Sequence, residues 1–566
     1  MTVRLHPDLA ILRRLADVAR GAAEADLTVS GGALVNVFTE ELQEDWGLAV
    51  AAGRVAFVGP DSDVLDRAGA GTERLDLEGG LVAPGLIEGH THLTRVRVSD
   101  MADAQVACGV TTSIVELQEA SFLVGPAGAR EFLSEAEQVA GRIFYTVSGM
   151  ISIDSDQDAR LRAEDWIPLL DHPRCAGLGE IYWPWLLRRH QRTESLIAAA
   201  LERGLAVEGH GAGARLPQVE ALAAFGVGSD HEGVDATDLL NRLRSGLIAL
   251  ARQGATRQDI AALANLADTG VDLSRMGAVT DGVEPEPLVR GQSLNRVVDA
   301  IVALGLPLPT AVRMATRTIA EHFGLGRWLG GLGPGMLADF AVVPRVGGFR
   351  PSTVRVGGHE PRPSPPSRYP AWMLDTCRLR GLSPGLLTRP PRGRYRAMEI
   401  QAASPLVTRE VESDGQSDLI CTVVDRAGGE RSFRGLLRGF GLRGGAIAIS
   451  SAWECPGALL VGDEPSDLAV AAQRLQDLRG GAVVVSREEV LAEFAAPVAG
   501  LYSQAPMAEV AQQVGAFNRA VTALGATVPN PLLSLEVLCT GAIPFLRIWA
   551  GGYRRLRDGS AVGLDW

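Results

Sequence analysis

Residues 81–92 read LVAPGLIEGHTH, an apolar run that ends in a His-x-His pair. On an extended strand, the side chains of residues i and i+2 point to the same side, so His90 and His92 can meet one metal ion. Neutral imidazole is a good ligand for Zn, Mn, Fe or Co. A pair of this kind is weak evidence alone, because two exposed loop histidines would give the same string. The stretch therefore predicts a strand with a candidate metal site at its end.

The same alternation of apolar strand and helical stretch continues downstream, at intervals of about 20–40 residues. The further strand-like segments are GVTTSIVEL (109–117), RIFYTVSGM (142–150), CAGLGEIYW (175–183), GLAVEGHGAG (204–213), FGVGSDHEG (225–233), SGLIALARQ (245–253) and SRMGAVTDG (274–282). Eight β–α units of this kind predict an α/β fold, a (β/α)₈ barrel that covers residues 81–329.

Ligand-type residues end several of these strands. Glu180, His210, His231 and Asp281 occupy the strand-end position that His90 and His92 hold in the first segment. The carboxyl ends of barrel strands share one face, which carries the chemistry. Six such residues on five strands predict a metal centre for one or two divalent ions, with Zn, Mn or Fe as candidates.

The segments around the barrel have other patterns. Residues 1–80 read as an N-terminal helix followed by short strands with glycine turns, which indicate a small sheet. A short strand pattern returns in residues 330–360, and a proline-rich linker follows in residues 361–394. Residues 395–566 read as a second region of strands and helices, so we expect a separate C-terminal domain.

Composition restricts the class of protein. The chain has 566 residues, 46% of them apolar, and a net charge of −13, which disfavours binding to nucleic acid or to an anionic membrane surface. No apolar run reaches the roughly 18–20 residues that span a bilayer. The six cysteines form no Cys-x-x-Cys pair, which fits reduced thiols and a cytoplasmic location.

The string VAPGLIEGHTHL, together with the four later ligand residues, resembles the amidohydrolase superfamily. The strings GEIYW, GHGAGARL, GVGSDHEG, RQGAT and GAVTDG resemble the adenine deaminase family more closely, and GLLRGFGLRGGAIAISSAW resembles its extra C-terminal domain. The resemblance implies a metal-bearing barrel, a β-sandwich built from residues 1–80 and 330–360, and an α+β domain over 395–566. It also implies a small-molecule substrate and a homodimer or higher homo-oligomer.

The resemblance implies a role for each ligand. His90 and His92 would hold one ion, His210 and His231 a second, and Glu180 would bridge them where the superfamily often uses a carboxylated lysine. Asp281 would bind the reacting water and move its proton, so Asp281, Glu180 and His231 form the expected catalytic set. In the alternative, only one ion is fully bound and His231 polarises the substrate.

The substrate shell departs from the family. Glu116-Leu117-Gln118-Glu119 replaces an Asp-Pro-His-Glu string, and Trp453-Glu454-Cys455-Pro456 replaces His-Asp-Ser-His. Three aromatic residues after Glu180, namely Tyr182, Trp183 and Trp185, either stack on a flat ring or pack against the C-terminal domain. The two acids beside His231 either relay protons or cap a helix. The expected substrate-binding residues are Gln118, Glu119, Tyr182, Trp183, Asp230, Glu232, Trp453 and Glu454.

These observations lead to one hypothesis and two alternatives. We expect hydrolysis of a C–N bond in a small nitrogen heterocycle, with release of ammonia, and a substrate other than adenine. Opening of a cyclic amide is the rival reaction, and ammonia release separates the two. A non-catalytic metal-binding scaffold is the alternative of another class, which any hydrolysis would exclude.

Overall fold

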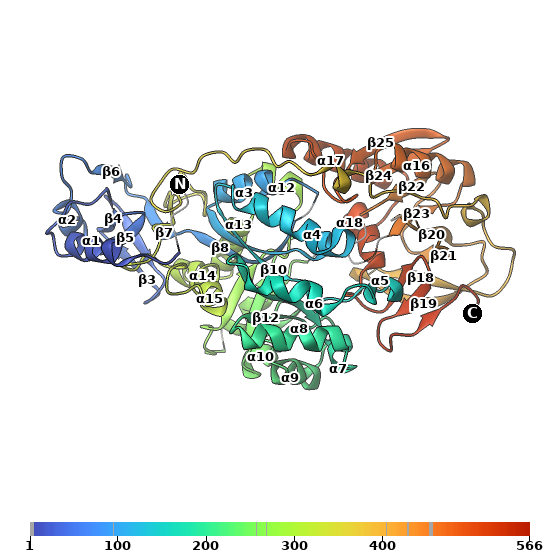
Figure 1. Ribbon diagram of the computed structural model, residues 1–566, viewed down its shortest axis with the longest axis horizontal. Coiled ribbons are helices and arrows are strands. Elements are labelled where there is room, and N and C mark those ends of the chain that lie inside the picture. Colours follow the sequence, from blue (N-terminus) through green and yellow to red (C-terminus); the bar gives the residue numbers. More distant parts are fainter. Residues whose placement is uncertain are drawn as a thin grey trace.

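The computed structural model describes residues 5–93, 95–255, 257–267, 269–402, 404–426, 429–451, 455 and 457–566. Its centre is an eight-stranded parallel sheet in the order β15-β14-β13-β12-β11-β10-β9-β8 (Figure 1). The strands are β8 (Leu86–His92), β9 (Val110–Glu116), β10 (Arg142–Val147), β11 (Cys175–Tyr182), β12 (Ala206–His210), β13 (Ser229–Asp230), β14 (Ile248–Arg252) and β15 (Met276–Val279). The two edges meet where the Asp281 N–H donates to the His90 carbonyl at 3.0 Å, so the predicted barrel is confirmed.

Helices enclose the barrel, which explains why its strands read as continuous apolar runs rather than as alternating ones. Every residue of β8 and of β9 is buried. The surrounding helices include α3 (Val98–Ala107), α4 (Gln118–Ala136), α8 (Gln191–Glu202), α9 (Leu216–Ala224), α10 (Ala236–Arg244), α13 (Leu294–Ala303), α14 (Leu308–Met314) and α15 (Arg317–His322).

Two small sheets form the end of the molecule that lies on the left in Figure 1. The first has the order β5-β4-β1-β6 and the second β17-β16-β7-β2-β3. Their strands are β1 (Leu27–Ser30), β2 (Ala33–Asn36), β3 (Glu41–Glu44), β4 (Trp46–Ala51), β5 (Arg54–Pro60), β6 (Glu73–Asp76), β7 (Leu81–Pro84), β16 (Phe340–Val343) and β17 (Thr353–Arg355). Because β16 pairs antiparallel with β7, the chain returns after the barrel to complete the second sheet. The N-terminal helix expected at the start of residues 1–80 is α1 (Leu9–Ala19), which buries Leu15 and Val18.

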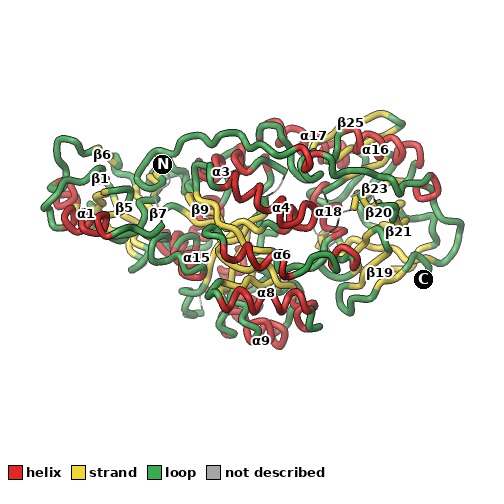
Figure 2. Tube along the Cα trace, viewed as in Figure 1, coloured by secondary structure: helices red, strands yellow, loops and turns green. Residues whose placement is uncertain are grey.

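The C-terminal domain is built on an eight-stranded sheet in the order β19-β18-β21-β20-β23-β22-β24-β25. Figure 2 shows these strands in yellow beside the red helices of the domain. The strands are β18 (Tyr395–Gln401), β19 (Ser404–Ser413), β20 (Leu419–Asp425), β21 (Ser432–Arg438), β22 (Ala446–Ile449), β23 (Gly457–Gly462), β24 (Gly481–Ser486) and β25 (Glu489–Ala495). The helices are α16 (Pro465–Asp477), α17 (Met507–Ala523) and α18 (Pro531–Glu536), and β26 (Leu546–Trp549), β27 (Gly552–Arg555) and β28 (Ala561–Val562) form a small sheet.

The C-terminal domain is fastened to the barrel at several points. Arg431 forms an ion pair with buried Asp154 at 2.6 Å, and Arg554 donates to the Ile153 carbonyl at 2.8 Å. The proline-rich segment contains no helix or strand in residues 361–370, and its Ser364 hydroxyl donates to Asp103 of α3 at 2.5 Å. None of the helices in the described ranges is long and apolar enough to cross a bilayer.

Candidate metal centre

The barrel brings the six expected ligands together at the carboxyl ends of its strands. His90 and His92 lie at the end of β8, Glu180 on β11 and His210 at the end of β12, while His231 and Asp281 follow β13 and β15. Their exposed fractions are between 1 and 6%. They form two groups that share Glu180, and within each group the ligand atoms lie within 4.8 Å of one another. Side chains 191 positions apart in the sequence thus face one small volume because the strand ends converge.

The first group consists of His90, His92, Glu180 and Asp281. His90 Nε2 lies 3.0 Å from Glu180 Oε1 and 3.4 Å from Asp281 Oδ1. His92 Nε2 lies 3.3 Å from each of the same two oxygens. Two imidazole nitrogens and two carboxylate oxygens therefore face one point, which is the donor set that Zn, Mn or Fe takes in proteins.

The second group consists of Glu180, His210 and His231. His210 Nδ1 lies 3.4 Å from Glu180 Oε2, and His231 Nε2 lies 3.6 Å from Glu180 Oε1. The two oxygens of Glu180 thus reach both groups, as a bridging carboxylate would.

The charge state of the cluster also fits divalent cations. Burial works against the charged form of His90, but the carboxylates of Asp281 and Glu180 outweigh it and raise its pKa to about 10. Burial likewise lowers the pKa of His210, but the charges of Glu180 and Glu232 outweigh it and raise that pKa to about 9. Burial would raise the pKa of Glu180, yet the surrounding imidazoles, His210 first, hold it well below the ordinary value. The carboxylates thus favour positive charge at His90 and His210, whereas burial and the charge of His90 hold the pKa of His231 well below its ordinary value. Divalent cations would supply the positive charge that the carboxylates attract.

Partners behind two of the histidines set their orientation. His92 Nδ1 lies 2.7 Å from Glu119 Oε1, so its Nε2 faces the first group. His210 Nε2 lies 3.2 Å from the Ala542 carbonyl, which can only accept a hydrogen bond, so Nε2 is the donor and Nδ1 is left to face the second group. Such partners fix the ring orientation and the tautomer of metal-binding histidines. Glu119, which we expected to contact substrate, lies behind a ligand, and the C-terminal domain supplies part of the metal centre.

Arg252, at the end of β14, was missed by the sequence reasoning. Its guanidinium lies 2.8 Å from Asp281 Oδ2 and 2.6 Å from Glu232 Oε1, and its exposed fraction is 2%. Burial would raise the pKa of Asp281, but the Arg252 charge and the histidines hold it well below its usual range. Oδ1 of Asp281 remains directed at His90 and His92. The sequence could have indicated Arg252, because this residue ends an apolar strand in the same way as the expected ligands do.

Asp281 also has an unusual backbone conformation. Its φ of 56° lies in the left-handed region, which residues other than glycine seldom adopt. The same residue forms the 3.0 Å hydrogen bond that closes the barrel. This backbone conformation and the Arg252 contact together fix where the carboxylate points.

The remaining expected substrate residues divide by position. The Tyr182 ring lies edge-on to His210 with centroids 5.5 Å apart, and the Trp183 indole donates to the Ala212 carbonyl at 2.9 Å. Asp230 accepts the Glu232 N–H at 2.7 Å and lies 3.4 Å from Arg242, so its carboxylate is held by the loop after β13 and by α10. Gln118 is buried at the start of α4. Trp453 and Glu454 lie outside the described residues.

Further buried charges near the centre were also missed. Glu116 accepts the Glu180 N–H at 3.2 Å and the Thr146 hydroxyl at 2.7 Å, and burial raises its pKa to about 8. Arg95, three residues after His92, lies 2.5 Å from both Glu284 and Glu536. No local pattern singles these residues out, because their partners are remote in the sequence.

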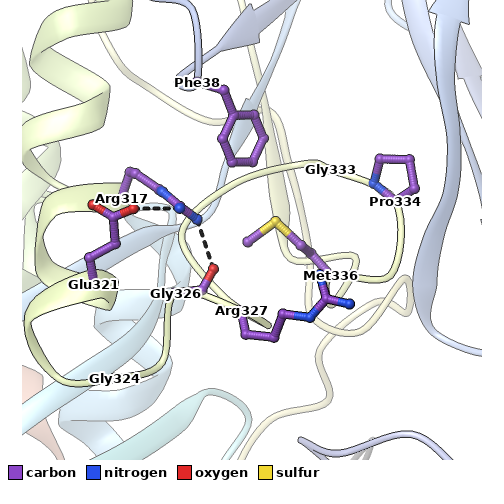
Figure 3. A pocket seen from close by; sticks show the side chains of 9 residues that line it. All are labelled: Phe38, Arg317, Glu321, Gly324, Gly326, Arg327, Gly333, Pro334 and Met336. Carbon is purple, nitrogen blue, oxygen red and sulfur yellow. Dashed lines mark hydrogen bonds and ion pairs between the residues drawn. The ribbon is translucent and has the colours of Figure 1, made fainter.

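A cavity of about 490 Å³ lies away from the metal centre, between the loop at Phe38 and α15 (Figure 3). Arg317 crosses its wall, paired with Glu321 and donating to the Gly326 carbonyl at 2.7 Å. None of the six ligands lines it, so size alone does not locate the functional site.

The fold and the ligand set define an amidohydrolase. Residues 189–360 match the amidohydrolase family, and residues 397–558 match the adenine deaminase C-terminal domain. The chain is 31% identical over 576 residues to an adenine deaminase of Moorella thermoacetica, with 96% of each chain covered. It is 32% identical over 581 residues to adenine deaminase 3 of Rhizobium meliloti, covering 96% of this chain and 97% of that one. The protein therefore belongs to the adenine deaminase family of amidohydrolases.

Among solved structures, one described as a molinate hydrolase superposes with a TM-score of 0.47 at 15% identity, over 60% of this chain and 95% of that one. The family assignment rests on the sequence relatives.

Proposed function

We propose that this protein is a metal-dependent hydrolase that replaces an amino group on a small planar nitrogen heterocycle with oxygen from water and releases ammonia. The observation that carries the proposal is the pair of ligand groups that share Glu180, with Asp281 held beside them by Arg252. Membership of the adenine deaminase family supports the reaction type.

The donor set suits one or two ions of Zn, Mn or Fe, because four imidazoles and two carboxylates match their preferences better than those of Mg or Ca. Divalent ions held by these side chains supply the electrostatic activation that lets water attack at neutral pH. Glu180 holds both positions together, and Glu119 and the Ala542 carbonyl keep His92 and His210 facing them.

Asp281 is the group that we assign to proton transfer. Its Oδ1 faces the ligand cluster, and the Arg252 charge and the histidines hold its pKa well below the usual range, which keeps the carboxylate ionised and able to accept a hydrogen bond from the reacting water. As the water oxygen forms its bond to the ring carbon, Oδ1 takes the proton. The same proton then goes to the departing nitrogen as the C–N bond breaks, so Asp281 returns to its starting state.

We propose further that adenine is a poor substrate. Gln118 stands near a position where the resemblance led us to expect a histidine, and Trp453 and Pro456 stand where it implies two more. A pocket that loses hydrogen-bonding groups usually discriminates by several powers of ten against the ligand those groups served.

The decisive experiment uses the purified, metal-loaded protein and a panel of aminated purines, pterins, hydantoins and lactams. We expect ammonia release from at least one amino-substituted heterocycle, at a rate at least about 10²-fold lower in the Asp281→Asn variant. Hydrolysis of a lactam or hydantoin without ammonia would replace deamination by ring opening. No hydrolysis of any compound, with metal bound, would favour the scaffold alternative. Adenine turnover with kcat/KM above about 10⁵ M⁻¹s⁻¹ would contradict the substrate proposal.

A further inference from the structure

A cavity of about 290 Å³ lies where the end of β11 and the loop after β12 meet two segments of the C-terminal domain, one directly before β26 and one between β27 and β28. Tyr182 ends β11 and Trp183 directly follows it, Ala212 and Arg215 come from the loop after β12, and Phe545 and Arg557 come from the two C-terminal segments. The volume is enough for a single ring system with one small substituent, so this is a small-molecule site rather than a protein-binding groove.

The cavity lies next to the metal centre, because its lining residues follow two of the expected ligands closely in the sequence. Tyr182 comes two residues after Glu180, and Ala212 comes two residues after His210. The Tyr182 ring, which lines the cavity, lies 5.5 Å from the His210 ring. On the opposite wall, the loop that carries Phe545 also carries Ala542, whose carbonyl contacts His210. A ligand in this cavity is separated from the second ligand group by one aromatic side chain.

The walls suit a flat ring. The Trp183 indole is held in place by its hydrogen bond to the Ala212 carbonyl, and the Phe545 side chain is 46% exposed although it lines the cavity. Exposed aromatic surface of this kind, fixed on one side and open on the other, favours stacking with a planar ligand. Of the two roles considered for Tyr182 and Trp183, stacking on a ring and packing against the C-terminal domain, this position allows the first.

The charge of the cavity is positive, although the chain as a whole carries −13. Arg215 and Arg557 line it, and neither guanidinium has an ion-pair partner among the residues that the structure describes. Arg557 lies over the Phe545 ring at 5.7 Å. Arg188 and Arg547 support the C-terminal wall through the carbonyls of Leu556 and Pro544. The nearby acid Asp558 accepts the Ser560 hydroxyl at 2.6 Å.

We propose that this cavity binds a planar nitrogen heterocycle that carries a carboxylate, with the ring between Trp183 and Phe545 and the carboxylate against Arg215 and Arg557. An arginine fork matches a carboxylate in geometry as well as in charge. The inference rests on the hydrolase proposed above where it concerns turnover: the cavity would select anionic heterocycles beside the metal centre, before their rings reach it, so these two arginines are specificity-determining. Neutral adenine lacks the group that they would hold.

Binding to the metal-loaded full chain is measured by titration calorimetry with nicotinate and nicotinamide, two probes of the same ring that differ in the carboxylate. We expect nicotinate to bind at least about tenfold more tightly, with a preference that weakens at high salt. Arg215→Gln and Arg557→Gln should each reduce that preference, and the double variant should abolish it. Arg13→Gln, an exposed arginine on α1 at the far end of the molecule, is the matched control and should change nothing.

Equal affinities for the two probes, or no binding of nicotinate, would overturn the inference. So would a preference that survives in the double variant, because the carboxylate would then be held elsewhere, for example by the metal. The same variants are assayed for turnover of 6-aminonicotinate and 6-aminonicotinamide. An arginine-dependent binding preference without turnover of any compound would leave the inference standing and reject the proposed function. Turnover of either compound with no arginine-dependent preference in binding would support the proposed function and overturn the inference.

Discussion

At the scale of single residues, the centre depends on which oxygen of each carboxylate faces which partner. Glu180 directs Oε1 at His90 and His92 and Oε2 at His210. Asp281 directs Oδ1 at the histidines and Oδ2 at Arg252. Each carboxylate therefore contacts two different partners through its two oxygens. Replacing each residue by the matching amide tests what its negative charge does.

Glu180→Gln tests the bridge between the two groups. The amide keeps the size of the side chain but removes the negative charge that two cations would share, so occupancy of one of the two positions should fall. Elemental analysis of the purified variant gives the number of ions per chain. Two ions per chain in both wild type and variant would show that Glu180 is not the bridge.

Asp281→Asn tests proton transfer. Most of the metal should remain, because Glu180 and the four histidines are intact, whereas kcat should fall by at least about 10²-fold because the amide cannot accept the proton. Metal content and steady-state kinetics on the best substrate are measured together. A near-normal kcat would reject the role that we assign to this carboxylate.

At the scale of elements, strand ends explain what the sequence could predict. The six ligands each end or follow an apolar run, and parallel strands bring such positions to one face. The contact of Glu119 with His92 was not predicted, because its place at the start of α4 says nothing about which side of His92 it occupies. Arg95 and Glu536, 441 residues apart, meet only after the C-terminal domain docks, so no local pattern could pair them.

Arg252 joins three of these elements, since it lies on β14 and binds the carboxylates that follow β13 and β15. Arg252→Gln should lower stability by about 3–5 kcal/mol, because two buried carboxylates lose their counter-charge. Thermal unfolding of the metal-loaded variant measures the loss, with Arg244→Gln on the surface of α10 as the control. An unchanged melting temperature would mean that solvent or metal already compensates these charges.

At the scale of the whole molecule, a buried charge cluster joins the barrel to the C-terminal domain. Arg95 lies 2.5 Å from Glu536 of α18 and 2.5 Å from Glu284, which follows Asp281 by three residues. The Ser451 hydroxyl donates to Glu536 at 2.5 Å, and the Arg95 carbonyl accepts the Ser503 N–H at 2.8 Å. The ligand-bearing loops and the C-terminal domain thus share one network.

Glu536 makes the strength of this junction depend on pH. Burial, helped by repulsion from Glu284, outweighs the attraction of Arg95 and raises its pKa to about 7. The folded chain therefore holds this proton at pH values where the unfolded chain has released it, so stability falls as pH rises from about 4.5 to about 7. We measure the melting temperatures of wild type and of Glu536→Gln at each pH. The wild-type value minus the variant value should fall as the pH rises across this range. The surface variant Glu286→Gln should follow wild type throughout, and a pH-independent difference for Glu536→Gln would contradict the raised pKa.

The pairing of β16 with β7 has a consequence for biosynthesis. β7 and β2 leave the ribosome early, yet their sheet is completed only by residues 340–355, which are translated after the whole barrel. Until then the edge of β7 offers unpaired backbone groups on a nascent chain, and such edges promote aggregation. We therefore expect the nascent chain to depend on chaperones during the interval in which the barrel is translated, and to lose that dependence once residue 355 has emerged.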